Sequence, residues 1–397
     1  MQIQRLLAIN FVGVQVVLTS AAWGNIAGYA PGSKVTDHNA IDLDQKAIEN
    51  ALAVATIDFE LVKNIYESGG NSKAYAVFTV PALASALSKG DAVTGATSGA
   101  IGSISSNAAQ GATTIKVAYK TSEVQAQYAT CKVGALQTAP SGTTPGALVP
   151  YQLVTGCFNS GEDLSITTSG GVITVTPSAG PTNKAGRTLK GFSTKAGGLM
   201  YTTGSNGGCA GGSDRVTDGC PYRDFAMYYN YYGDFDYANK FVLAAINGGP
   251  TDFTKSDADM DFTGAADVVR KECIKKGTAY MNAYMYAIRE FEDAIDDCKA
   301  GCANGIVGSG ASCNSLSTAS VHAWDEGVAF YTGSREGAAV GGDSAGVLSY
   351  RLAEKHCKNF KTCGPNHDST TGTSYVNTEL FRQFAIGAHS VLLGQCE

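Results

Sequence analysis

Two carboxylates near the end of a predicted helix could serve as metal ligands. Apolar residues recur at helical spacing over Ala265–Cys298. Glu292 and Asp296 lie four residues apart in this stretch, so they share one face of the helix. Carboxylate oxygens bind hard and borderline cations, iron among them. The alternative is ordinary salt bridging, in which Arg289 pairs with Asp293 and neutralises the local charge.

The next predicted helix begins near Ser317 or Ser320 and ends by Gly333. It carries three further candidate ligands, namely His322, Asp325 and Glu326. His322 and Glu326 are four residues apart and therefore lie on one face. In the alternative interpretation, the polar residues at this point only cap the helix and occupy its first turn.

The two helices would bring Glu292, Asp296, His322 and Glu326 together if they form an antiparallel hairpin. Turning back across the 299–318 loop, His322 lies beside residue 295 and Glu326 beside residue 291. Facing helices that carry carboxylates are also how di-iron bundle proteins build their sites. We therefore predict an iron site made by Glu292, Asp296, His322, Asp325 and Glu326.

Two other motifs could carry chemistry, and each has a simpler explanation. The tyrosine-rich block over 228–237 could supply phenolate ligands to ferric iron, but tyrosines at helical spacing usually pack. Gly342–Gly346 matches the Gly-x-Ser-x-Gly nucleophile elbow of hydrolases. No buried strand precedes it, so Asp343 or Ser344 is better explained as a helix cap. We expect a binding protein and not an enzyme.

Three regions differ in their sequence pattern. Residues 23–90 are expected to be helical, with one stretch beginning near Asp42 and Asp44 and a second running through Leu83 and Leu87. Residues 91–183 are rich in Gly, Ser and Thr. Short runs with period-two alternation predict strands there, over 113–119, 127–133, 151–158, 164–168 and 172–177.

Helices are expected again over 184–397, including 345–360 and about 377–393. Residues 91–110 are interpreted as a linker. The predicted fold is therefore a mainly α protein, a helical bundle with a small inserted antiparallel β unit, stabilised by disulfides.

The N-terminus and the cysteines indicate an exported protein. Residues 1–22 resemble a signal peptide, with Arg5 before a short apolar run. Export makes the eleven cysteines disulfide candidates. Their spacing suggests four pairs, namely Cys131–Cys157, Cys209–Cys220, Cys302–Cys313 and Cys357–Cys363. Because eleven is an odd number, one cysteine has no partner within the chain, and Cys396 is the candidate. We expect a secreted or periplasmic protein, or one at the outer cell surface.

The charge balance and hydropathy narrow the range of partners. The formal net charge of −6, without a basic cluster, argues against nucleic acid. No segment has the length and apolarity of a membrane-spanning helix. A metal ion is the partner that the candidate residues favour.

Several segments resemble the low-iron-inducible periplasmic, or iron-assimilating, protein family of algae. The block from Val321 to Ser334 is the most specific of them. The others are Gly69–Lys73, Gly186–Thr194, Lys276–Asn282, Ile288–Cys298 and Asn359–Gly364. The resemblance implies a protein that captures iron at the cell surface under iron limitation and works with a cell-surface uptake system. The alternative is a structural or adhesive extracellular protein without metal.

Overall fold

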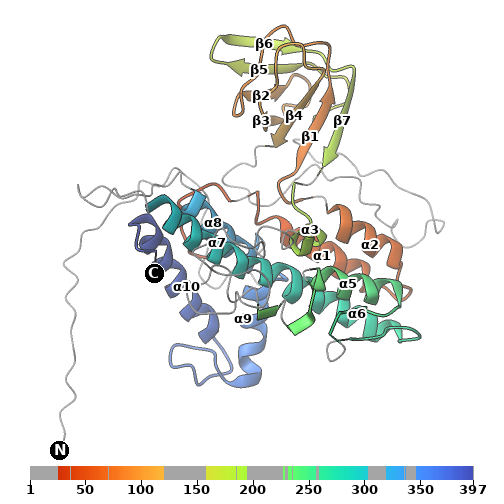
Figure 1. The fold of residues 1–397 in the computed structure, drawn as a ribbon, viewed down its shortest axis with the longest axis vertical. Helices are drawn as coiled ribbons and strands as arrows, with labels where there is room; N and C mark the ends of the chain where they lie inside the picture. Colours follow the sequence, from red (N-terminus) through yellow and green to blue (C-terminus); the bar gives the residue numbers. More distant parts are fainter. Residues whose placement is uncertain are drawn as a thin grey trace, which may run out of the picture.

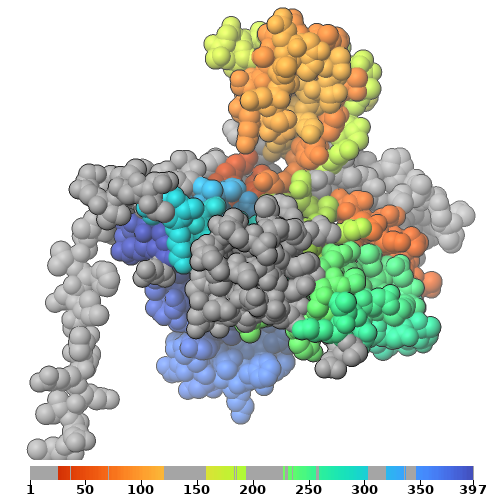
Figure 2. Space-filling view, viewed as in Figure 1, coloured from red at the N-terminus to blue at the C-terminus, as the bar shows by residue number. Residues whose placement is uncertain are grey.

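The computed structural model describes residues 26–35, 37–69, 71–119, 158–184, 186–194, 227–228, 231–234, 236–255, 259–302, 319–334, 336 and 346–396. Within these ranges the chain forms a helical body and a separate β-sheet unit, which Figure 1 shows standing above the helices. In the space-filling view the sheet unit projects from the body (Figure 2). Among the described helices, none combines the length and the apolarity needed to span a bilayer.

The sheet unit has seven antiparallel strands in the order β6-β5-β2-β3-β4-β1-β7. Buried and exposed residues alternate in β4, so one face packs on a core and the other meets solvent. The strands are β1 (Tyr75–Thr79), β2 (Ala92–Gly95), β3 (Ile101–Ile104), β4 (Thr114–Tyr119), β5 (Leu164–Thr168), β6 (Gly171–Val175) and β7 (Ala179–Lys184).

The expected fold class, a helical bundle with a small β insertion, is wrong. The sheet has a hydrophobic core of its own, built around residues such as Phe78, Phe158 and Ile166, and it shares none of these with the helical core. The sheet also begins at Tyr75, within the stretch predicted as a second helix through Leu83 and Leu87. The β unit is therefore a second folding unit of the molecule.

The predicted strands over 113–119, 164–168 and 172–177 correspond to β4, β5 and β6 and are confirmed. The linker expected over 91–110 is wrong, because β2 and β3 lie there. These strands have only four residues each, too short for alternation to stand out from a Gly- and Ser-rich background. The predicted strand over 127–133 and most of that over 151–158 lie outside the described residues.

The helical body packs around buried aromatic side chains. Phe192 stacks on Tyr286 with ring centroids 4.2 Å apart, and Phe330 contacts both rings edge-on. The helices are α1 (Ile41–Ala51), α2 (Phe59–Ser68), α3 (Leu189–Thr194), α5 (Tyr237–Asn247), α6 (Asp267–Lys276), a π-helical segment (Gly277–Tyr284), α7 (Met285–Cys302), α8 (Ala319–Thr332), α9 (Ser349–Phe360) and α10 (Tyr375–Leu392).

The α7–α8 hairpin has the predicted register. The Phe291 ring lies against Gly327, where a Cβ atom would come within 2.6 Å of the ring, so the glycine allows this close approach. Trp324 of α8 also packs against Phe291, with the two ring centroids 4.9 Å apart. Gly387 of α10 meets the same indole. Small residues thus fix how closely α8 packs against its neighbours.

Two segments connect the sheet unit to the helical body, residues 72–73 before β1 and residues 186–187 after β7, and together they form its stem. β1 leaves from Ser72 and Lys73, and β7 returns to Gly186, whose backbone N–H donates to both of their carbonyls at 3.1 Å. A side chain at Gly186 would collide with Lys73, because a Cβ atom there lies 2.8 Å from the lysine Cβ. The residue that follows Gly186 is Arg187. Its position is therefore set by the closure of the sheet unit.

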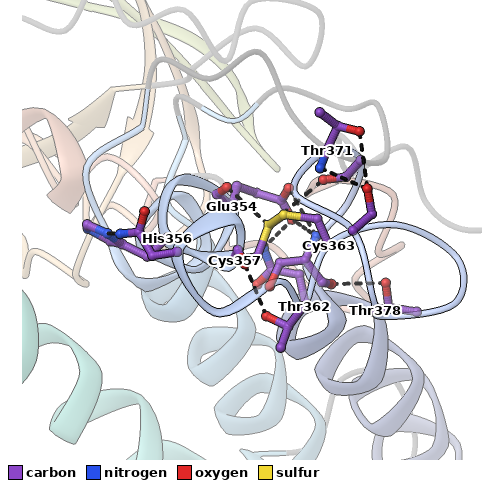
Figure 3. Close-up of a disulfide and its surroundings, with 12 residues drawn as sticks. Glu354, His356, Cys357, Thr362, Cys363, Thr371 and Thr378 are labelled. Atoms are coloured by element: carbon purple, nitrogen blue, oxygen red, sulfur yellow. Dashed lines mark hydrogen bonds between the residues drawn. A yellow bond between two sulfur atoms is a disulfide. The ribbon is translucent and has the colours of Figure 1, made fainter.

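Two disulfides lie within the described residues. Cys357–Cys363 joins the end of α9 to the following turn, beside Glu354 and Thr362, and was predicted from spacing (Figure 3). Cys298–Cys396 ties α7 to the segment that follows α10. The expectation that Cys396 is unpaired is therefore wrong. The pair was missed because its two cysteines are 98 residues apart, and local spacing does not suggest such a pairing.

Among the described cysteines Cys273 is the free one. Cys302 is disulfide-bonded. Its expected partner Cys313 lies outside the described residues, as do the expected pairs Cys131–Cys157 and Cys209–Cys220.

A buried carboxylate holds two loops of the sheet unit together. Glu162 accepts hydrogen bonds from the backbone N–H groups of Thr97, Ser98 and Asn159 and from both hydroxyls of the 97–98 turn. Burial opposes its ionisation, but these hydrogen bonds outweigh burial and lower the pKa of Glu162.

Glu162→Gln is expected to destabilise the protein by about 2 kcal/mol at neutral pH, since hydrogen bonds to a charged group contribute about 1.5–3 kcal/mol. The folded pKa is below the unfolded one, so this stabilisation is complete above the unfolded value and disappears as the pH falls through the folded value. Urea unfolding of wild type and variant measures the effect. The difference in unfolding free energy between wild type and Glu162→Gln should shrink in acid. A difference that does not change with pH would contradict this prediction.

Candidate metal centre

Two imidazoles and one carboxylate converge between α1 and α8. His38 Nε2 lies 2.7 Å from Glu326 Oε1, and His322 Nε2 lies 3.0 Å from the same oxygen. The three atoms are all within 4.8 Å of one another. His38 and Glu326 are almost fully buried, whereas the His322 side chain is 39% exposed. The group is therefore reached from the side of His322.

Three separate parts of the chain position these ligands. His322 and Glu326 lie one turn apart on α8. His38 lies in the turn that precedes α1, where its backbone N–H donates to the Val35 carbonyl at 2.9 Å. The His38 carbonyl accepts from the Ser72 hydroxyl at 3.1 Å. The stem of the sheet unit thus holds the His38 turn against α8.

Charged neighbours orient the carboxylate and the buried imidazole. Arg187 donates to Glu326 Oε2 at 3.0 Å, which leaves Oε1 for the two histidines. Asp37 Oδ1 lies 3.1 Å from His38 Nδ1. Because a carboxylate can only accept, His38 Nδ1 carries the proton of this bond. Its Nε2 is then the ring atom that faces Glu326.

A hydrogen-bond chain fixes the second imidazole in the same way. The Ser33 hydroxyl donates to Asp325 Oδ2 at 2.7 Å, so its oxygen must accept from His322 Nδ1, 3.0 Å away. Tyr29 donates to the other oxygen of Asp325 at 2.6 Å. This arrangement of a carboxylate and a hydroxyl behind an imidazole is typical of the outer shell of a metal site. His322 Nε2 is therefore also directed at Glu326.

The pKa values follow from these contacts. Burial opposes ionisation of Glu326, but contacts with His322, His38 and Arg187 outweigh it and hold its pKa well below the usual range. Burial would lower the pKa of His38, yet Asp37 and Glu326 raise it overall. The same pairing, aided by Lys34 and Lys73, lowers the pKa of Asp37 to about 2 against the effect of burial.

The contact between His38 and Glu326 is short. His38 Nε2 and Glu326 Oε1 are 2.7 Å apart, and the carboxylate helps to raise the pKa of His38. When neither Nε2 atom carries a proton, two nitrogen lone pairs and a carboxylate oxygen face one another. Such a group needs a cation between its members, either a proton or a metal ion.

The spacing of the three atoms suits a metal ion. Metal–nitrogen and metal–oxygen bonds of about 2.1 Å place neighbouring ligand atoms roughly 3.0–3.4 Å apart. The two distances from an imidazole Nε2 atom to Glu326 Oε1, 2.7 and 3.0 Å, are close to this range. Two histidines and one carboxylate on one side of an ion leave its remaining positions open, an arrangement found in non-haem Fe(II) proteins.

The structure brings together two of the five predicted ligands. His322 and Glu326 belong to the centre, and Asp325 supports it through Ser33. Glu292 and Asp296 belong to no group of three potential ligands among the described residues, and each has other interactions. Because each residue turns a helix by about 100°, they lie about 160° and 120° around α7 from the buried Glu290. The predicted register was right, but the predicted face was not.

Sequence reasoning missed His38, Arg187 and Glu290. His38 lies in a loop with no helical periodicity, and only its place directly before a predicted helix marks it out. Arg187 lies within Gly186–Thr194, a segment singled out for its resemblance alone. Glu290 is the acidic residue of α7 that points inward, where it pairs with Arg289 at 2.8 Å. Burial and the nearby Glu326 raise its pKa, against the effect of Arg289.

The other sequence candidates do not form a second site within the described residues. Tyr232 stacks on Tyr237 at 4.6 Å and lies 5.0 Å from the Phe253 ring, so these aromatic residues pack against one another. Residues 229, 230 and 235 of the tyrosine-rich block lie outside the described residues, as do residues 342–345 of the Gly-x-Ser-x-Gly motif.

No family model, no curated protein and no solved structure matches the chain. Function must therefore be argued from the residues and their geometry.

Arg187→Met tests how the charges of the centre are balanced. Removing one partner of a buried ion pair costs about 3 kcal/mol or more, because the other charge stays buried and loses its partner. The matched control is Lys190→Met, which breaks the partly exposed pair with Glu67 and should cost less than about 1 kcal/mol. Chemical unfolding of both variants measures the two costs. If both variants lost an equally small amount of unfolding free energy, Arg187 would not balance the charge of Glu326.

Proposed function

We propose that the protein binds iron as Fe(II) through His38, His322 and Glu326, and that it captures iron outside the cytoplasm. The observation that carries this proposal is the set of two imidazole Nε2 atoms facing one carboxylate oxygen. Outer partners fix both rings in the tautomer that a metal requires.

The donor set favours a borderline divalent ion. Imidazole binds Fe(II), Zn(II) and other first-row ions, whereas Mg²⁺ and Ca²⁺ prefer oxygen ligands. Tyr29 lies behind the centre, where its hydroxyl donates to Asp325. Burial, Asp325 and the hydrogen bond between them raise the pKa of Tyr29 well above its usual value, which disfavours a phenolate ligand.

Capture and release both need access to the bound ion. Three protein ligands leave coordination positions for water or for a ligand from an acceptor, and the partly exposed His322 lies on the accessible side. In this role iron is the cargo of the protein and not a catalytic cofactor. A cell-surface iron uptake system is the partner that such a role implies.

An extracytoplasmic location has independent support. The disulfides Cys298–Cys396 and Cys357–Cys363 fit an oxidising compartment. The first 22 residues resemble a signal peptide. The resemblance of Val321–Ser334 to iron-assimilating proteins points the same way, since this segment is α8 with two of the three ligands.

Anaerobic calorimetric titration with Fe(II) tests the proposal. Wild type should bind one ion per chain, and His38→Ala and Glu326→Gln should each weaken binding more than about 100-fold, because loss of outer partners alone costs 10–100-fold. Glu292→Gln and Asp296→Asn are the matched controls and should bind like wild type. Mg²⁺ should not compete. Thermal unfolding checks that each variant is folded.

Two results would contradict the proposal. One is wild-type protein that binds neither Fe(II) nor Zn(II), in which case a proton bridges the three groups. The other is binding that survives His38→Ala but is lost in Glu292→Gln. Oxidation of the loaded protein to Fe(III) adds a separate check, since a visible phenolate-to-Fe(III) band would place the metal on tyrosine.

A further inference from the structure

A second cavity lies beside the metal centre but contains none of its ligands. It has a volume of about 540 Å³ and lies between residues 27–32, α8, α9 and α10. Cavities of about 300–1,000 Å³ are the usual size for small-molecule sites. Asp325 separates the two places, because it lines the cavity and also holds Ser33 behind His322. The cavity is therefore a separate place for a ligand.

The long wall of the cavity is one stripe of α10. Phe381, Ala385, Ala388 and Leu392 follow each other at intervals of four, three and four residues, so they line one face of the helix. The opposite wall, residues 27–32, consists of small residues apart from Tyr29 and Pro31. Small side chains on both walls keep the space open. Its lining is mainly apolar.

The charges in the lining select against an anionic ligand. Among the described residues no lysine or arginine lines the cavity, and the one carboxylate that does so is Asp325. Both oxygens of Asp325 already accept hydrogen bonds from Tyr29 and Ser33. Apart from tyrosines, the other titratable lining residue is His389, which is exposed. An anion would meet a buried carboxylate without a buried cation to balance it, which is costly.

We propose that this cavity binds a compact, uncharged and mainly apolar small molecule. Its body lies along the Phe381–Leu392 face of α10. Two threonines line the same cavity, Thr373 and Thr378. The Thr378 hydroxyl donates to the Ser374 carbonyl at 3.1 Å, so its oxygen can accept from a hydroxyl of the ligand. The site does not depend on the metal centre, so it can be tested whether or not the protein binds iron.

Fluorescence titration with Nile red, an uncharged apolar dye, tests the proposal on the full chain. Wild type should give a saturable rise in emission with one dye per chain. Ala385→Trp and Ala30→Trp fill the cavity from opposite walls at exposed positions, and each should weaken binding by about tenfold or more. Ile386→Trp is the matched control, because residue 386 is exposed next to Ala385 but does not line the cavity.

The anionic dye anilinonaphthalene sulfonate tests the charge argument. It should bind at least about tenfold more weakly than Nile red. Equal weakening by Ile386→Trp and Ala385→Trp, or tighter binding of the anionic dye, would overturn the proposal. Near-ultraviolet circular dichroism shows whether each variant keeps its packing. Two filling variants on separate walls keep the test decisive if one of them fails to fold.

Discussion

The buried carboxylate of Glu326 is the constraint on which the surrounding structure depends. One of its oxygens faces two imidazole nitrogens and the other accepts from Arg187. A charge placed this deep is tolerated only with several partners. Each partner comes from a different part of the chain. The ionised Glu326 therefore links the turn before α1, the stem of the sheet unit and α8 into one assembly.

The sheet unit takes on a role that its separate core does not suggest. Its two stem segments are hydrogen-bonded to each other, and they carry Ser72, which holds the His38 carbonyl, and Arg187, which pairs with Glu326. The helical body supplies the other side through α8, held close to α7 by Gly327. Folding of the sheet and formation of the centre are thus coupled through the stem.

The sequence revealed the long periodic helices and the hairpin that carries His322 and Glu326, because these features repeat over many turns. It did not reveal which side of α7 is buried. The acidic end of that helix offers four carboxylates over 290–296, namely Glu290, Glu292, Asp293 and Asp296, and only Glu290 among them is buried. His38 could not be found either, since its partner lies in a distant part of the chain and contacts between loops leave no periodic pattern.

The most direct test of this account is X-ray absorption spectroscopy at the iron edge on protein loaded with one equivalent of Fe(II). The account predicts a first shell of nitrogen and oxygen at about 2.1 Å, with the outer-ring scattering typical of two imidazoles. In His38→Ala the scattering should correspond to one imidazole. A first shell of oxygen alone, or a wild-type spectrum that His38→Ala leaves unchanged, would contradict it.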